Sequence, residues 1–253
     1  MTQPTAAMLV IGDEILSGRT REANAHHLAG VMTGMGIQLT EIRVVADDWD
    51  TIIQAVNALR AQVDNLFTSG GIGPTHDDIT ADCVAAAFGA PIDVRADALA
   101  ILQAHYTATG RTLNEARLRM ARIPDGATLI ENPVSHAPGF SLGNVHVMAG
   151  VPAIFQAMLE SLRPRLTGGD LVLSYAFRVE APEGDLAGPL GELAAAHPKV
   201  SMGSYPFYTT GPGATLILRA SDRDALNAAA DGLRAVLSEM GVPVAETPPG
   251  SQE

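Results

Sequence analysis

The chain has 253 residues, 47% of them apolar, which is enough to bury the core of one large domain or of a medium domain joined to a small one. Its 28 acidic residues outnumber the 16 basic ones, and the net charge of −12 argues against nucleic-acid and anionic-membrane surfaces, which need dense Lys and Arg. A single cysteine excludes an intrachain disulfide. No apolar run approaches the ~20 residues of a membrane span, and the N-terminal residues lack the basic region of a signal peptide. We therefore expect a cytoplasmic protein.

The first part of the chain alternates between strand and helix patterns. An apolar run over 6–11 predicts a buried strand, and apolar residues at helical spacing over 21–35 predict a helix. A β pattern returns over 37–46, after which Asp47 or Asp48 is expected to cap the next helix, with metal contact as the alternative. This alternation predicts right-handed βαβ units on a largely parallel sheet.

Residues 65–80 have the order of a strand, a tight glycine loop and the start of a helix. Glycines allow positive φ and let backbone N–H groups approach a ligand, and a helix N-terminus favours an anion such as phosphate. Two acidic residues in the loop would repel a bare phosphate, so either they face away or a divalent cation sits between the like charges, and the cation is our central hypothesis. The residues concerned are Gly70, Gly71, Gly73, Asp77 and Asp78.

A second pair of carboxylates, Asp13 and Glu14, directly follows the first strand. Loops after parallel strands share one edge of the sheet, so these carboxylates are expected to meet the glycine loop and to hold a metal or activate water. Simpler roles stay open: solvated loop carboxylates for this pair, and helix capping for Asp78. Asn24 is expected either to cap a helix or to bond a ligand.

The remaining chain is expected to complete this domain and to add a small second one. A boundary near 167–170 leads to the division into a domain over 1–168, a small α+β domain over 169–246 and a disordered tail over 247–253. In the first domain we expect helices at 80–88, 95–109, 113–122 and 153–166, and strands at 128–130 and 144–149. The second is expected to be a βαββα unit with strands at 171–180, 199–205 and 214–220, and helices at 186–196 and 222–240.

Five separated motifs together resemble the molybdopterin-binding (MoaB/Mog-like) domain, in the branch found in CinA (competence/damage-inducible protein A) and in eukaryotic FAD synthases. They are 12–18, Asn24, the 68–80 loop, Asn132-Pro133 with 137–139, and 150–152. The resemblance covers about residues 5–166, and 203–206 is similar to the small domain that follows in those proteins. It implies a three-layer α/β/α sandwich with a mostly parallel sheet, followed by a small α+β domain.

The resemblance also implies a function. In the CinA branch it implies a nucleotide pyrophosphatase that acts on ADP-ribose or FAD with Mg, Mn or Co and with potassium. Asp13, Asp77 and Asp78 would serve catalysis, and Asp13, Glu14 and Asp78 would hold the metal. The nucleotide or pterin would bind through Gly12, Asn24, Ser69, Gly70, Gly71, Gly73, Pro74, Thr75, Asn132, Pro133 and Gly139. We also expect a homo-oligomer.

Departures from the family pattern bear on the reaction and on the substrate. Asp77 stands where adenylyl-transfer enzymes usually carry a basic residue, which favours hydrolysis. Ser135-His136 stands where a glycine followed by Thr or Lys is expected, and Ala149 replaces a usual proline, so the substrate stays open. The alternatives are a pterin- or nucleotide-binding module without chemistry, and molybdopterin adenylyl transfer in molybdenum cofactor biosynthesis. An RNA-binding role for the small domain is not favoured, because that region is acidic.

Overall fold

The structure, a computed structural model, describes residues 3–208 and 211–249. The chain divides into two compact units, Met1–Gly169 and Asp170–Glu253. The tail that we expected to be disordered from residue 247 begins within a strand, β12 (Val244–Thr247), and residues 250–253 lie outside the described part. Within the described ranges, no helix is long and apolar enough to cross a membrane.

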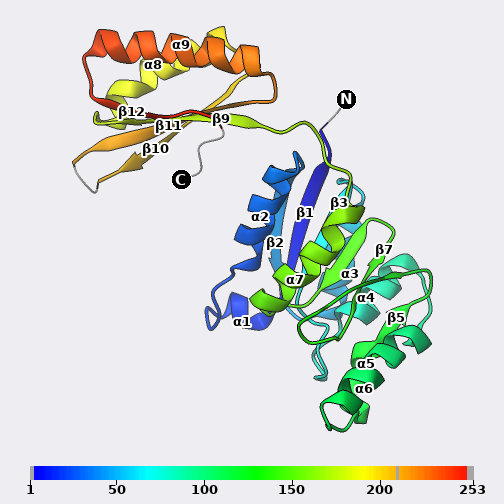
Figure 1. The fold of residues 1–253 in the computed structure, drawn as a ribbon. Helices are drawn as coiled ribbons and strands as arrows, with labels where there is room; N and C mark the ends of the chain where they lie inside the picture. Colours follow the sequence, from blue (N-terminus) through cyan, green and yellow to red (C-terminus); the bar gives the residue numbers. More distant parts are fainter. Residues whose placement is uncertain (1–2, 209–210, 250–253) are drawn as a thin grey trace. The chain divides into compact units, whose positions relative to one another are not determined.

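The first unit is built on a six-stranded, mostly parallel sheet (Figure 1). The strands β1, β2, β3 and β8 run parallel, and helices connect β1 to β2 and β2 to β3. The strand β7 runs antiparallel between β8 and β6. In spatial order the strands are β2 (Gln38–Val45), β1 (Thr5–Ile11), β3 (Asn65–Ser69), β8 (Val145–Met148), β7 (Gly139–Leu142) and β6 (Thr128–Ile130).

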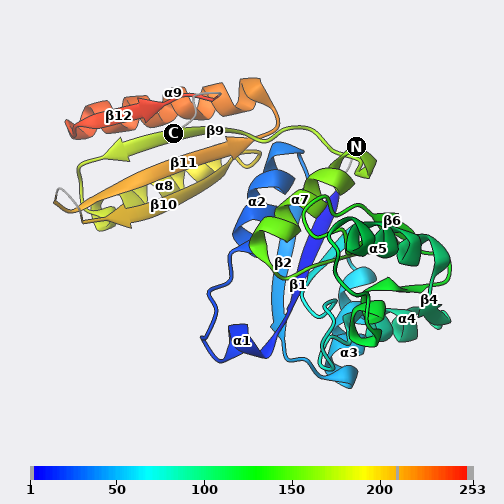
Figure 2. The same ribbon diagram turned by 60° about the horizontal axis from the view of Figure 1, so that its bottom comes forward.

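Helices cover both faces of this sheet (Figure 2). Successive side chains of a strand point to opposite faces, so Met8 joins one core while Leu9 joins the other. The three-layer α/β/α sandwich predicted from the sequence is confirmed. One face carries α2 (Asn24–Gly34) and α7 (Pro152–Leu162), and the other carries α3 (Trp49–Arg60) and α4 (Thr80–Phe88).

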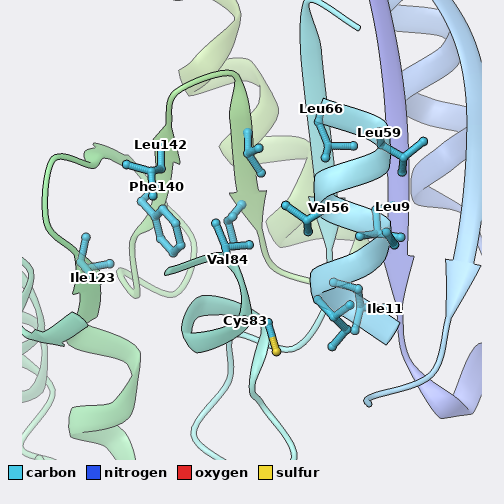
Figure 3. Packing of buried hydrophobic residues seen from close by; sticks show 14 of the residues in the cluster. Leu9, Ile11, Val56, Leu59, Leu66, Cys83, Val84, Ile123, Phe140 and Leu142 are labelled. Carbon is cyan, nitrogen blue, oxygen red and sulfur yellow. The ribbon is translucent and has the colours of Figure 1, made fainter. Parts of the chain in front are cut away.

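The core between the sheet and α3 and α4 is formed by buried aliphatic and aromatic side chains (Figure 3). Val56 of α3 and Val84 of α4 pack there with Leu66 of β3. Cys83 is fully buried in the same core, and burial raises the pKa of its thiol to about 12. The single cysteine is therefore a packing residue, as the helical pattern around it predicts.

A small lobe lies between α4 and β6 in the sequence. The predicted helix over 113–122 is wrong: its first half is a single turn, and its last residue opens a strand. Ile123 precedes a proline, which disfavours helical geometry, and it is buried in the core, so the chain becomes extended there. The lobe contains β4 (Ile92–Val94), α5 (Ala96–Ala108), α6 (Glu115–Leu118), a 3₁₀ turn at Arg119–Ala121 and β5 (Arg122–Pro124), which pairs with β4.

The second unit is a four-stranded antiparallel sheet with two helices packed on one face (Figure 1). The predicted βαββα order is confirmed, and β12 adds a strand that the sequence did not reveal. The elements are β9 (Leu173–Val179), α8 (Glu183–Ala196), β10 (Ser201–Phe207), β11 (Gly213–Ala220) and α9 (Arg223–Met240), with the strands in the order β10-β11-β9-β12.

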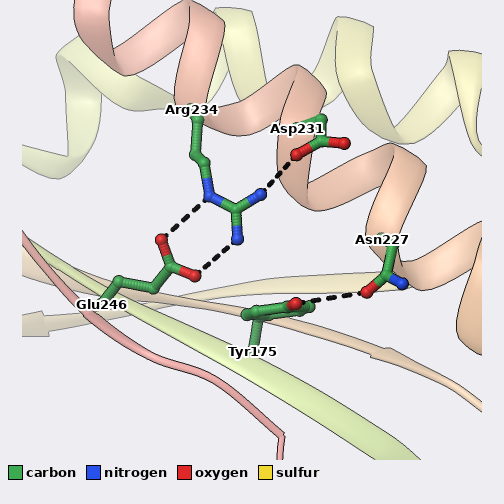
Figure 4. Close-up of polar contacts among 5 residues, drawn as sticks. All are labelled: Tyr175, Asn227, Asp231, Arg234 and Glu246. Carbon is green, nitrogen blue, oxygen red and sulfur yellow. Dashed lines mark hydrogen bonds and ion pairs between the residues drawn. The ribbon is translucent and has the colours of Figure 1, made fainter.

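An arginine on α9 holds β12 in place (Figure 4). Arg234 donates from Nε to Glu246 Oε2 at 2.9 Å and from Nη2 to Glu246 Oε1 at 2.6 Å. It also donates to Asp231, one turn earlier on the same helix. Because β12 has only four residues, this two-point contact supplements its short hydrogen-bond ladder with β9.

Candidate functional site

The ends of β1 and β3 lie side by side at one edge of the sheet. The two strands are parallel neighbours with Val10 opposite Ser69, so the segments that follow them leave the sheet together. The first of these segments forms a short helix, α1 (Asp13–Leu16). The second is the glycine loop. Both line a cavity of about 540 Å³, which is within the usual size range of small-molecule sites.

The glycine loop presents unpaired backbone donors to this cavity. The Gly70 N–H is bonded to the Met148 carbonyl, and the Thr75 N–H to the Asp78 carboxylate. The N–H groups of Gly71, Ile72 and Gly73 have no acceptor among the described residues, and all three residues line the cavity. Consecutive unpaired N–H groups of this kind form an anion-binding concavity.

The conformation of the loop requires glycine. Gly71 has φ +66°, and a Cβ there would overlap the Thr80 hydroxyl. A Cβ at Gly73 would come within 2.6 Å of a carboxylate oxygen of Asp78. The loop is therefore folded tightly against the start of α4, and a side chain at either position would displace it.

Asp78 braces this loop. Its Oδ2 accepts the Thr75 N–H at 2.8 Å and also the Thr75 hydroxyl. The capping role considered for Asp78 is not observed, because α4 is preceded by Ile79 and has no side-chain cap. The carboxylate nevertheless lines the cavity, so Asp78 both shapes the loop and adds negative charge to the site.

Four carboxylates line the cavity: Glu14, Asp47, Asp77 and Asp78. Partial burial raises the pKa of Asp47, and the charges of Glu14 and Asp77 raise it further. Among these four carboxylates, Asp47 is therefore the best candidate for a proton acceptor.

Asp47 is the residue that the sequence left undecided between capping and metal contact. In the structure Asp48 caps α3 by accepting the Thr51 N–H at 2.9 Å. Asp47 instead accepts the backbone N–H of Asp13 at 2.9 Å and faces the cavity. Asp13, predicted to serve in catalysis and metal binding, has an exposed side chain that does not line the cavity. Its backbone positions Asp47.

Asn24 and Asn132 hold the surrounding loops. Asn24 is the first residue of α2, not its cap, and is 3% exposed. Its Nδ2 donates to Ser69 Oγ at 2.8 Å and to the Gly150 carbonyl at 2.7 Å. Asn132 donates to Ser135 and to the Ala137 carbonyl and accepts two backbone N–H groups. Both asparagines are buried, so each fixes a wall of the cavity through internal hydrogen bonds.

The remaining predicted residues divide between lining and supporting positions. Gly139 packs against Val147 and Met158 at the start of β7 and has no part in the cavity. The sequence-predicted residues that line it are Gly12, Glu14, Gly70, Gly71, Gly73, Pro74, Asp77, Asp78 and Asn132. Those that do not are Asp13, Asn24, Ser69, Thr75, Pro133 and Gly139.

Sequence reasoning did not assign the apolar wall of the cavity. The 150–152 motif was noted as part of the family pattern but given no role, and helical periodicity gave no reason to place Met120 at the site. The wall comes from three separate segments and includes Met120, Ala137, Ala149, Val151, Pro152 and Ile154. It suits a flat, weakly polar ring beside an anionic group.

The carboxylates fit a divalent ion in donor type. Among the described residues, no three His, Cys, Asp or Glu side chains converge as a metal site. Magnesium, however, is usually held by one or two carboxylates together with substrate phosphates, so a complete protein cage is not required. Burial is the main cause of the raised pKa of Asp47, and neighbouring carboxylates add to it; a bound cation would offset that second contribution.

Comparisons with known proteins agree with this architecture. Residues 7–168 match the family described as probable molybdopterin binding domain, and residues 172–246 match the FAD synthase middle domain. A solved structure, CinA of unknown function from Thermoplasma acidophilum, is 35% identical and has a TM-score of 0.60, covering 64% of this chain and 98% of that one.

Two bacterial CinA-like proteins are similar over most of this chain. The protein of Myxococcus xanthus is 32% identical over 242 residues, 88% of this chain, and that of Geobacter sp. (strain M21) is 34% identical over 241 residues, 90% of this chain. This chain spans 57% of the length of each. A protein of Aeropyrum pernix is 34% identical over 212 residues, 80% of this chain and 79% of its own. The chain belongs to the molybdopterin-binding domain family and is similar to its CinA-like members.

Proposed function

We propose that this protein is a metal-assisted hydrolase that cleaves the phosphoanhydride bond of a dinucleotide such as ADP-ribose or FAD. The observation that carries the proposal is the meeting of unpaired loop N–H groups and four carboxylates in one cavity. The first set suits phosphate oxygens and the second suits a cation and a water molecule. The apolar wall accommodates the ring of a nucleoside or flavin.

Binding is assigned to the backbone of the glycine loop. The N–H groups of Gly71, Ile72 and Gly73 would donate to oxygens of the diphosphate. Asp78 holds the turn that presents them, through its hydrogen bonds to Thr75. Asn24 and Asn132 keep the neighbouring loops in position. These contacts orient the anhydride before reaction, which accounts for much of the rate acceleration in phosphoryl transfer.

The carboxylates are assigned to the reaction itself. Asp47, whose pKa is raised, would accept a proton from the attacking water. The water oxygen bonds to one phosphorus while the bond from that phosphorus to the bridging oxygen breaks. With ADP-ribose the products are AMP and ribose 5-phosphate, and with FAD they are AMP and FMN. A divalent ion held by Glu14, Asp77 or Asp78 would supply charge neutralisation and make the water more acidic.

The test is an assay of AMP release by the purified chain. ADP-ribose and FAD are offered with Mg²⁺, Mn²⁺ or Co²⁺, each with and without K⁺. We expect turnover of at least one dinucleotide, and we expect Asp47→Asn to lower kcat by about a hundredfold or more, the usual contribution of a proton acceptor. The matched control is Asp48→Asn, which keeps a good capping residue next to Asp47 and should retain wild-type activity.

Two results would contradict the proposal at different levels. Failure to release AMP from either dinucleotide under every ion condition would remove the hydrolase assignment. Wild-type turnover by Asp47→Asn would remove only the role given to Asp47.

The second candidate is a binding module without chemistry. The observation that favours it is the absence, within the described residues, of three converging metal-ligating side chains. It predicts that nucleotides or pterins raise the unfolding temperature without turnover. Molybdopterin adenylyl transfer is less favoured, because Asp77 stands where adenylyl-transfer enzymes usually carry a basic residue.

A further inference from the structure

The lining of the acidic cavity is one-sided in charge. Among the residues that the structure describes, four carboxylates line it and no Lys, Arg or His does. A diphosphate ligand would bring further negative charge to the same place. Loop N–H groups offset part of this repulsion, but a nearby cationic side chain would offset more, since charges interact strongly in a partly desolvated site.

Such a cation lies directly behind the glycine loop. A small second cavity of about 20 Å³ shares Gly71, Gly73 and Asp78 with the large one and is also lined by Arg119 and Arg122. Its volume holds one water-sized group. The space therefore admits a single water molecule, next to the loop that also lines the large cavity.

The two arginines differ in how they are used. Arg122 is paired with the Asp82 carboxylate, which raises the pKa of the guanidinium. Arg119 donates from Nη2 to the Asp78 carbonyl at 3.1 Å, and its buried Nε has no hydrogen-bond partner. Among the described residues, no carboxylate lies within ion-pairing distance of Arg119. A buried charged donor without a hydrogen-bond acceptor destabilises the fold unless a ligand or a water molecule accepts its hydrogen bond.

We propose that Arg119 is the positioning residue for the anionic part of the ligand: its guanidinium fixes the Asp78 peptide and places a positive charge beside the glycine loop. This inference deepens the proposed function, on which its substrate class rests. It predicts that the site discriminates by charge, because only a phosphate-bearing ligand gains from Arg119. The discrimination should weaken at high salt, since part of it is electrostatic.

The experiment compares charged and uncharged probes on the full chain. Inorganic pyrophosphate and ADP-ribose, each with Mg²⁺, are titrated by calorimetry, with adenosine as the uncharged probe. We expect Arg119→Gln to weaken binding of both anions by about tenfold to a hundredfold, the usual effect of removing a charged hydrogen bond, and to leave adenosine binding unchanged. In the hydrolysis assay the KM for ADP-ribose should rise more than kcat falls.

Two further variants separate charge from structure. Arg117→Gln makes the same charge change in the neighbouring helical turn, at a residue that lines neither cavity, and should leave all three affinities unchanged. Arg119→Lys keeps the charge but loses the guanidinium hydrogen bond to the Asp78 carbonyl, and should show an intermediate loss. If Arg119→Gln unfolds at a clearly lower temperature, the lysine variant supplies the same comparison in a folded protein.

The outcomes distinguish this inference from the proposed function. Pyrophosphate binding that depends on Arg119, without turnover of any dinucleotide, supports the inference and overturns the hydrolase. Turnover of ADP-ribose with the same KM in wild type and Arg119→Gln supports the hydrolase and overturns the inference. Equal weakening of adenosine and pyrophosphate would also overturn it, because a merely structural role affects both.

Discussion

Asp47 and Asp48 are neighbours in the chain, yet only one of them faces the cavity. Asp48 caps α3, because its carboxylate reaches the Thr51 N–H and hydroxyl. Asp47 is turned to the other side, where the Asp13 N–H fixes it. Asp47 and Asp48 are equally good capping residues by type. The sequence therefore predicts a carboxylate at this edge of the sheet, but not which of the two aspartates caps the helix and which faces the cavity. The choice depends on a contact with a residue 34 positions away.

At the residue scale, the glycine loop gives a direct test of geometry. We expect Gly71→Ala to destabilise the protein by about 1–3 kcal/mol, since the new Cβ meets the Thr80 side chain and the residue is held at positive φ. It should also abolish pyrophosphate binding by displacing the loop N–H groups. Urea unfolding and calorimetry measure the two effects.

The control for that substitution is Gly30→Ala. Gly30 lies within α2, and a Cβ there would meet no atom within 4 Å. Alanine is a better helix former than glycine, so this variant should gain about 0.5–1 kcal/mol and bind normally. Unchanged stability and binding in Gly71→Ala would contradict the close packing of Gly71 against Thr80.

At the element scale, the sequence predicts elements well where local pattern and tertiary packing agree. The helix over 80–88 was predicted with its end at Gly89, and α4 has these bounds with Gly89 in the left-handed conformation. The strands β4, β5, β7 and β12 were not predicted. Each has three or four residues, too few to show a period, and each is defined by a partner strand. Their signal lies in pairing, which local sequence does not contain.

The attachment of β12 to α9 is expected to depend on pH. Hydrogen bonds from Arg234 hold the pKa of Glu246 below its ordinary value of 4.5. A depressed carboxylate pKa contributes stability that is present above the unfolded-state pKa and is lost as the pH falls through the folded-state pKa. We therefore expect the amides of β12 to lose protection, measured as the exchange rate relative to that of the unfolded chain at the same pH, below about pH 4.5, and Glu246→Gln to show this loss already at neutral pH.

The size of that effect should be modest. The Arg234 and Glu246 side chains are 40% and 29% exposed, so the pair should contribute about 1 kcal/mol or less. Hydrogen–deuterium exchange over Val244–Thr247 measures it. Glu160→Gln, which removes the more exposed pair with Arg163, is the control and should change exchange nowhere in the second unit. Equal protection of β12 in wild type and Glu246→Gln at pH 7 would show that the Arg234–Glu246 pair does not stabilise this strand.

At the scale of the whole molecule, the two units have separate cores, and the candidate site belongs to one of them. Every residue that lines either cavity lies within Met1–Gly169. The topology explains why the site could be anticipated in outline: parallel strands bring 12–14 and 70–78 to one edge whatever the details of the loops. It also explains why the sequence did not predict the apolar wall of the cavity. Met120 reaches the cavity from the lobe, and residues 149–154 reach it from the end of β8.

Acid should act on the first unit through His146 of β8. This residue is 7% exposed, and burial lowers the pKa of its imidazole to about 4. A neutral ring satisfies both neighbours when Nε2 donates to Asn65 Oδ1 at 3.2 Å and Nδ1 accepts the Ser141 hydroxyl at 2.9 Å. The unfolded chain binds a proton near pH 6.5 and the folded one does not, so stability is full above pH 6.5 and declines as the pH falls towards 4. The total loss is roughly 3 kcal/mol.

The measurement uses Trp49, the only tryptophan of the chain, which lies at the start of α3 and so reports on the first unit. Urea unfolding followed by its fluorescence should give a free energy of unfolding that falls between pH 6.5 and 4 in the wild type. His146→Gln cannot take up the proton, so its curve should be flatter over this window, whereas His26→Gln, at an exposed position on α2, should follow the wild type. A His146→Gln variant with the full wild-type slope would show that another group carries the acid sensitivity of this unit.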